Sequence, residues 1–313
     1  MRGRQGESTL GGGATMGFTS RLAGAPISWG VCEVPGWGHE LPVDRVLDEM
    51  HQLGLTATEL GSEGYLPTDP DALREVCGGH GLEMIGGFVP LVLHDRDERQ
   101  ATIDTAHRAA GLMAGAGGTY FISAAVASWD WDPPHPLDEA EWRHSFEMLA
   151  RIDEVVHDHG MVQALHPHLG TQVERRDDVL RVLDGSDVGW TFDTGHLLLG
   201  GMDPMEFARD AMARVRHVHL KDVHMDLAAP VLAGEASLMR GVQAGMFCNL
   251  GQGDVPIREI VATLEAAGYQ HWYVLEQDAA ITSGLPEVGG GPLVDVRASI
   301  DYLRGIEASV SAA

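Results

Sequence analysis

The sequence has few of the features that mark secreted or membrane-bound proteins. Its three cysteines, Cys32, Cys77 and Cys248, lie far apart and form no zinc motif, as is usual in a reducing compartment. No apolar run approaches the ~20 residues that a transmembrane helix needs. We therefore expect a cytoplasmic protein without a membrane partner.

The N-terminal segment lacks the apolar core of a signal peptide. Arg2 and Arg4 are followed by a glycine-rich polar stretch, and Met16 is an alternative start. We expect residues 1–24 to form a flexible leader and residues 25–313 to form one folded domain.

Basic residues are also scarce. The chain has 21 lysines and arginines against 46 acidic residues, a formal charge of −25. A nucleic-acid-binding protein needs a basic surface to replace the counterions of the phosphates, so this composition argues against a nucleic-acid partner. The sequence contains neither the glycine-rich phosphate loop of a nucleotide-binding protein nor the G-x-S-x-G turn of a serine hydrolase.

What the sequence does contain is a repeated unit of about 30 to 40 residues, the length of one β-strand plus one α-helix. Short apolar runs alternate with amphipathic stretches, which is typical of a parallel sheet covered by helices. The predicted strands are 25–30, 57–61, 83–90, 119–123, 162–166, 189–193, 217–221 and 272–276. Eight such strands predict a single (β/α)₈ TIM barrel, an α/β fold.

Amphipathic helices are predicted between these strands. Residues 43–53, for example, place Val43, Val46, Leu47 and Met50 on one face and stop at a glycine. The other predicted helices are 71–77, 98–114, 138–159, 176–183, 204–212 and 257–267. Two connections, 129–136 and 223–255, are longer than the fold requires. Long structureless loops of this kind are usually lids or binding loops.

Metal-ligand residue types recur at the ends of the later strands. Because the C-terminal ends of barrel strands meet at one mouth, Asp193, His219 and Glu276 are expected to converge, with His166 as a fourth ligand. Imidazole and carboxylate ligands suit Mn²⁺, Co²⁺, Fe²⁺, Zn²⁺ or Mg²⁺. A lone histidine is more often a core residue, and an aspartate after a strand is often a helix N-cap. Four consecutive strand ends with the same feature favour a divalent-metal site.

Seven segments carry a resemblance to a known family. PISWG, TATELG, HPHLGT, FDTGH, HVHLKD, LGQGD and VLEQD are similar to segments of the xylose-isomerase-like superfamily of TIM barrels, which includes the sugar phosphate isomerases and epimerases. Within it the chain most resembles the inosose dehydratase group of inositol catabolism. The resemblance runs from about residue 25 to residue 278, nearly the whole folded chain.

The resemblance implies a metal held by Glu, Asp, His and Glu from strands five to eight. Asp193, His219 and Glu276 match the last three, but His166 stands where the first glutamate is usual. His166 is therefore the preferred fourth ligand, with His168 or Glu174 as alternatives. The resemblance also implies a cofactor such as Mn²⁺ or Co²⁺, and a small polyol or keto-sugar as substrate. A homo-oligomer is left open.

The implied reaction removes water from a keto-inositol through an enediolate, which requires a base for the α-proton and an acid for the leaving hydroxyl. The candidates are His196, Lys221, His168 and Glu59. Lys221 beside a cation is expected to have a lowered pKa, unless it pairs with Asp222 or another carboxylate. Glu59 could equally form a structural ion pair.

Substrate contacts are expected from the longer loops. Trp29 and Trp37 flank the loop after strand one and could cover the apolar face of a sugar ring, although lid packing explains them equally well. Phe247 and Asn249 could close over the substrate from the loop after strand seven. Glu174 could contact the substrate from the loop after strand five.

Four functions remain to be compared. A dehydratase and a ketose isomerase or epimerase share the metal and the enediolate, but the epimerase needs a base on each face of the carbon. His166 in place of a glutamate favours the dehydratase of a keto-inositol, with a lyase acting on another keto-sugar as a variant. The charge of −25 argues against a nuclease on the same barrel. A non-catalytic binding protein would have no use for a complete ligand set.

Overall fold

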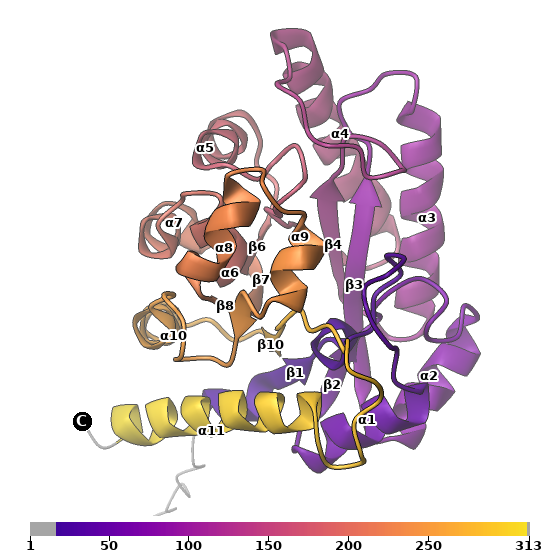
Figure 1. The fold of residues 1–313 in the computed structure, drawn as a ribbon. Coiled ribbons are helices and arrows are strands. Elements are labelled where there is room, and N and C mark those ends of the chain that lie inside the picture. Colours follow the sequence, from indigo (N-terminus) through magenta and orange to yellow (C-terminus); the bar gives the residue numbers. More distant parts are fainter. Residues whose placement is uncertain (1–16, 312–313) are drawn as a thin grey trace, which may run out of the picture.

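The computed structural model describes residues 17–311, and its core is a closed parallel barrel of eight strands (Figure 1). The strands follow the order β1-β10-β7-β6-β5-β4-β3-β2 around the barrel. Their bounds are β1 Leu22–Gly24, β2 Ala57–Glu59, β3 Glu83–Leu91, β4 Tyr120–Ala125, β5 Val162–Leu165, β6 Trp190–Asp193, β7 Val215–Leu220 and β10 Tyr273–Leu275. The predicted fold class, a single (β/α)₈ barrel, is confirmed.

Helices surround the barrel, and their sequence signals explain where they begin. The helix after β4 starts at a capping box, in which the Asp138 carboxylate accepts from the backbone of Ala140 and Glu141 and the Glu141 carboxylate accepts from the Asp138 N–H. The outer helices are α1 Val43–Gln52, α2 Pro70–Gly79, α3 Arg99–Gly115, α4 Glu139–Asp158, α5 Arg176–Gly185, α6 Thr194–Leu199, α7 Pro204–Ala211, α10 Ile257–Ala266 and α11 Pro292–Ser311.

The first strand lies earlier than predicted. Residues 26–29 form the 3₁₀ helix η2, Pro26–Trp29, instead of a strand, because proline has no N–H to donate to a ladder. The strand is β1, which follows the 3₁₀ helix η1, Phe18–Arg21, and pairs with β10. Residues 22–24, expected to belong to the leader, therefore form a barrel strand, and residues 18–21 form the short helix that precedes it. The rest of the expected leader, residues 1–16, lies outside the described residues.

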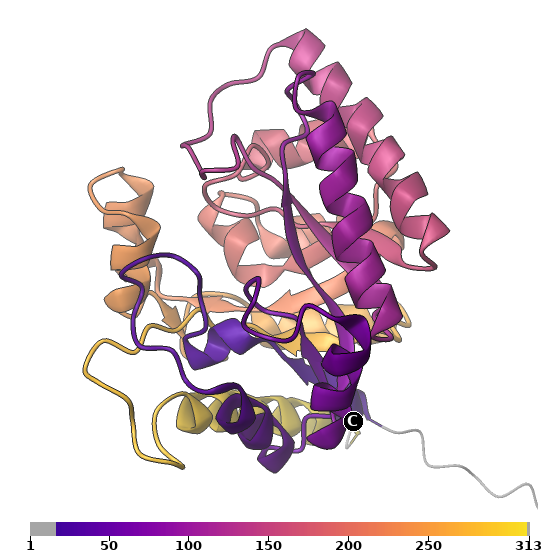
Figure 2. The same ribbon diagram turned by 90° about the vertical axis from the view of Figure 1, so that its right-hand side faces the viewer.

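The segment after β7 is also not the structureless loop that we predicted. It contains a small antiparallel pair, β8 Asp222–Val223 and β9 Phe247–Cys248, and two helices, α8 Met225–Leu232 and α9 Leu238–Gln243. In Figure 2 these helices (orange) project from the barrel beside the segment after η2 (indigo) and the segment before α11 (yellow). The side chain of Gln243 donates to the carbonyls of Gly36 and Trp37, at 2.9 Å each. These bonds join α9 to the segment after η2.

Asp222 organises the end of this segment. Its buried carboxylate accepts from the backbone N–H of Val223, Gly251, Gly253 and Val255 at 2.8–3.0 Å. A Cβ atom on Gly253 would lie 2.3 Å from this carboxylate, so only glycine fits. Asp222 is thus occupied by the backbone and is not the partner of Lys221.

Replacing Asp222 by alanine is expected to lower the free energy of unfolding by about 3 kcal/mol, because buried N–H groups would lose a charged acceptor. Denaturant titration measures this loss. Asp226→Ala is the matched control, since the exposed Asp226 carboxylate accepts only from the adjacent Leu227 N–H. Equal stability of the two variants would contradict the structural role of Asp222.

Candidate metal centre and active site

Four side chains from the ends of β5, β6, β7 and β10 meet at the mouth of the barrel. His166, Asp193, His219 and Glu276 each offer one ligand atom, and these atoms all lie within 4.8 Å of one another. The Asp193 Oδ2 atom lies 3.1 Å from His166 Nε2 and 3.6 Å from His219 Nδ1. His219 Nδ1 is also in close contact with Glu276 Oε2. These are the four residues expected from the sequence.

The strand register explains why they meet. Asp193 and His219 are directly paired between β6 and β7. The Oδ1 atom of Asp193 accepts from the His196 N–H at 2.7 Å and caps α6, which leaves Oδ2 directed at the cluster. Asp193 therefore serves both as the helix cap and as a candidate ligand, which the sequence had presented as alternatives.

The donor set fits a divalent cation. Among the described residues, His219 Nδ1 and Glu276 Oε2 are buried atoms without a hydrogen-bond partner, although they face each other. Buried polar atoms of this kind are normally satisfied, and a shared cation would satisfy both. Burial lowers the pKa of His219, but Glu276 and Glu59 outweigh it and raise that pKa well above its usual value. Protonation of His219 would therefore compete with the binding of a cation to its Nδ1 atom.

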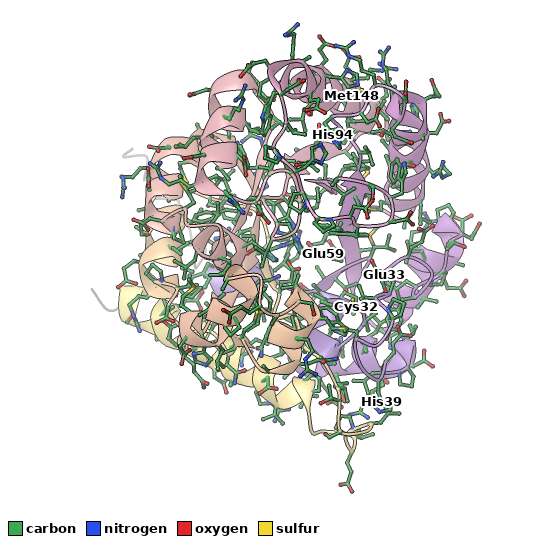
Figure 3. All side chains as sticks on the ribbon, turned by 45° about the horizontal axis from the view of Figure 1, so that its top comes forward. Cys32, Glu33, His39, Glu59, His94 and Met148 are labelled. Carbon is green, nitrogen blue, oxygen red and sulfur yellow. The ribbon has the colours of Figure 1, made fainter. Side chains whose placement is uncertain are left out.

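Glu59 of β2 contacts the cluster through His219 and lies near the centre of the view in Figure 3. Its Oε1 atom accepts from His219 Nε2 at 2.9 Å and from His217 Nε2 at 2.6 Å. A donor role for Nε2 leaves Nδ1 of His219 free for a metal. Burial raises the pKa of Glu59, but the two histidines outweigh it and lower that pKa. These contacts agree with the alternative that Glu59 forms structural ion pairs, and a catalytic role for it stays a prediction.

Replacing Glu59 by glutamine is expected to weaken metal binding about 10- to 100-fold, because the charged acceptor that orients His219 is lost. Calorimetric titration with Mn²⁺ or Co²⁺ gives the affinity directly. Glu63→Gln makes the same change at an exposed position nearby and should bind as the parent does. An unchanged affinity in Glu59→Gln would refute the positioning role.

Lys221 is fully buried beside the cluster. Its Nζ atom lies 2.7 Å from Asp278 Oδ1, 3.4 Å from Glu276 Oε1 and 3.8 Å from Asp193 Oδ2. Burial lowers the pKa of Lys221, but these three carboxylates outweigh it and raise that pKa, which agrees with the alternative that Lys221 pairs with a carboxylate. Lys221 therefore places a protonated ammonium group beside the cluster. The sequence analysis missed Asp278, although its place two residues after Glu276 was a usable signal.

Two neutral histidines complete the site. The rings of His168 and His196 lie 3.9 Å apart between centroids. His168 Nδ1 lies 2.8 Å from the Leu169 carbonyl, whereas His196 Nδ1 accepts from the Leu169 N–H at 3.2 Å. Burial, His166 and Lys221 lower the pKa of His168 to about 3, and burial lowers that of His196 well below its usual value. Both rings can therefore act while uncharged.

The expected substrate contacts divide into two groups. Phe247 of β9 lies at the site, with its ring centroid 4.9 Å from Lys221 Nζ and 5.9 Å from the His196 ring. Asn249 lies farther along the same segment, beside the Asp295 carboxyl of α11. Glu174 is not part of the metal cluster, since its carboxylate accepts from the Gly170 N–H and from the Arg175 side chain.

The two expected tryptophans are packing residues in this structure. Trp29 is fully buried, and its Nε1 atom donates to Glu49 of α1 at 2.9 Å. Trp37 is 6% exposed and donates to the Ala279 carbonyl at 2.7 Å. These contacts replace the expected stacking of both rings on a substrate, because each indole is enclosed by the chain itself.

The comparisons with known proteins agree with the barrel fold. The family model described as xylose isomerase-like TIM barrel matches residues 47–306. The chain belongs to the xylose isomerase-like TIM barrel family.

Among individual relatives, the inosose dehydratase of Geobacillus kaustophilus is 32% identical over 275 residues, which cover 83% of this chain and 89% of that protein. A solved structure of an L-ribulose 3-epimerase matches with a TM-score of 0.69 and 15% identity, over 93% of this chain and 96% of that one. The IOLI protein, solved with a bound zinc atom, matches with a TM-score of 0.67 and 14% identity, over 92% and 98%. These two structures establish similarity of fold.

Within residues 17–311, no helix combines the length and the apolar character that crossing a bilayer requires.

Proposed function

We propose that this chain is a metal-dependent dehydratase that removes water from a keto-inositol. The observation that carries the proposal is the His166–Asp193–His219–Glu276 cluster with the Lys221 ammonium beside it. The inosose dehydratases among its relatives support the same reaction and a small polyol ketone as the substrate. Mn²⁺ or Co²⁺ is the metal that we expect first, with Zn²⁺, Fe²⁺ or Mg²⁺ as alternatives.

The reaction requires a proton to leave the carbon next to the ketone and a hydroxyl to leave the neighbouring carbon. A divalent ion bound by the cluster would supply Lewis acidity that stabilises negative charge on the ketone oxygen. The base is best assigned to His168, because Nδ1 donates to the Leu169 carbonyl and Nε2 keeps its lone pair. His196 has a donor at each ring nitrogen, the Leu169 N–H 3.2 Å from Nδ1 and the Lys221 ammonium 3.1 Å from Nε2.

Lys221 and His196 supply the acid side of the reaction. Lys221 Nζ lies 3.1 Å from His196 Nε2, and the ammonium is the proton source of this pair. A proton passed from this pair to the leaving hydroxyl releases it as water, while the proton taken by His168 balances the charge. Asp278 orients Lys221 through the contact at 2.7 Å. Phe247 covers the lysine and excludes solvent from it.

An epimerase is the second candidate function, because L-ribulose 3-epimerase shares the fold. Epimerisation needs a proton acceptor on each face of the reacting carbon. At the first ligand position this chain has His166, whose Nε2 atom already lies 3.1 Å from Asp193 Oδ2. Glu276 is therefore the only glutamate of the cluster, and the cluster has no second glutamate in place as a proton acceptor on the other face. This arrangement favours elimination.

The direct test incubates the purified protein with scyllo-inosose and Mn²⁺ or Co²⁺. Absorbance of an unsaturated diketone is the expected result, and it should disappear with a chelator. Deuterium uptake from heavy water without loss of water would establish the isomerase or epimerase instead. Turnover of a 3-keto-sugar but not of scyllo-inosose would move the assignment to another keto-sugar lyase. No reaction with any of these substrates would overturn the proposal.

A further inference from the structure

One aromatic side chain at the barrel mouth is exposed and held in an unusual backbone conformation. Trp131, in the segment between β4 and α4, is 40% exposed. It is the only non-glycine residue among residues 17–311 with positive φ, at 58°. The left-handed region is unfavourable for a side chain with a Cβ atom, so the surrounding segment must impose it.

The segment that contains Trp131 is fixed at several points. The Trp131 N–H donates to the Ser128 carbonyl at 3.2 Å, and the Ser128 hydroxyl donates to Asp132 at 2.8 Å. Farther along, the Gln172 amide lies 3.2 Å from a ring nitrogen of His135. These contacts hold the turn that presents the indole ring at the surface.

The indole ring stacks on Phe88 of β3. The two ring centroids are 6.0 Å apart and the planes differ by 14°. We call these two rings the aromatic pair. Phe88 in turn contacts His166 at 5.7 Å and His168 at 5.6 Å, and Trp131 lies 6.1 Å from His168, all between ring centroids. The aromatic pair therefore borders both a candidate metal ligand and the proposed base.

Aromatic faces bind the C–H groups of a ring that has no hydroxyls on that face. In a cyclohexanone whose hydroxyls are all equatorial, the axial C–H bonds form an apolar surface on each side of the ring. We infer that the aromatic pair binds this C–H face and makes the enzyme select all-equatorial ring polyols over isomers with an axial hydroxyl. The inference rests on the proposed function, since it names the feature by which that site recognises its substrate.

Trp131→Ala tests this selection. We expect KM for scyllo-inosose to rise about 10-fold, as one lost apolar contact in a binding site predicts, while kcat changes less than about threefold. The preference over an inosose isomer with one axial hydroxyl should fall by a similar factor, and Trp131→Phe should restore part of both. Trp129→Ala is the matched control, because Trp129 is 38% exposed in the same segment but bonds to Glu98. Unchanged KM and preference in Trp131→Ala would overturn the inference.

Trp131→Gly separates the backbone from the side chain. Glycine accepts positive φ, so this variant should share the KM of Trp131→Ala but melt about 2 °C higher. A KM that returned to the parent value in Trp131→Gly would show that the strained backbone, and not the indole ring, affects binding, and would overturn the inference.

Binding of scyllo-inositol, a non-reacting polyol with the same equatorial hydroxyls, distinguishes failure of this inference from failure of the proposed reaction. Calorimetric binding that is lost in Trp131→Ala, in a protein that does not dehydrate the ketone, would support the aromatic pair and refute the dehydratase. Dehydration with normal binding in Trp131→Ala would support the dehydratase and refute the pair. Neither binding nor dehydration would refute both.

Discussion

Asp193→Asn is expected to abolish metal binding and to lower dehydratase activity more than about 100-fold. Losing a residue that only hydrogen-bonds to a metal ligand typically lowers affinity or activity about 10- to 100-fold, and losing a ligand itself should have a larger effect. Asparagine retains an oxygen that can accept from the His196 N–H, so the cap of α6 survives while the anionic ligand is lost. Metal content of the dialysed protein and initial rates with scyllo-inosose measure the two effects.

Asp203→Asn is the matched control for this variant. Asp203 caps α7 by accepting from the Met205 N–H at 2.9 Å and takes no part in the metal cluster. It should keep the metal and the activity. If Asp193→Asn retained full metal content and normal folding, Asp193 could not be a ligand.

Lys221→Met is expected to have the second largest effect. It removes the cation that lies among Asp278, Glu276 and Asp193, and unpaired buried charge typically costs 3–5 kcal/mol. Activity should fall about 10²- to 10⁴-fold, the usual contribution of a general acid. Denaturant titration and steady-state rates measure the two losses separately.

A double variant, Lys221→Met with Asp278→Asn, separates stability from catalysis. Removing the negative charge of the nearest partner should restore much of the stability, because the Lys221–Asp278 contact at 2.7 Å is the shortest that the ammonium makes. Activity should stay low, since the proton donor is still absent. Recovery of activity in the double variant would show that Lys221 has only a structural role.

The metal cluster could be predicted from the sequence because a parallel barrel brings its strand ends together. Once Asp193, His219 and Glu276 are placed on consecutive strands, their convergence follows from the fold, whatever the details of the loops. Phe247 was predicted as a substrate contact from the length of the connection after β7, although the prediction did not include the β8–β9 pair that carries it.

Contacts set by distant segments could not be predicted in this way. Trp29 was predicted to follow the first strand and so to lie near the mouth of the barrel. Its buried indole instead donates to Glu49 of α1, a contact that no local sequence pattern reveals. The carboxylate partner of Lys221 was left open, and it is Asp278, which reaches the lysine from the segment after β10. The length of residues 129–136 marked a binding loop but did not single out Trp131, because a tryptophan carries no mark of a left-handed turn.

The most direct test of the account is a crystal structure of the protein grown with Mn²⁺, with the ion located by its anomalous scattering. We predict one strong peak at the barrel mouth, within about 2.0–2.3 Å of Asp193, His219 and Glu276 atoms, and with His166 as the fourth ligand. A peak elsewhere in the molecule, or these three side chains directed away from one another, would contradict the account.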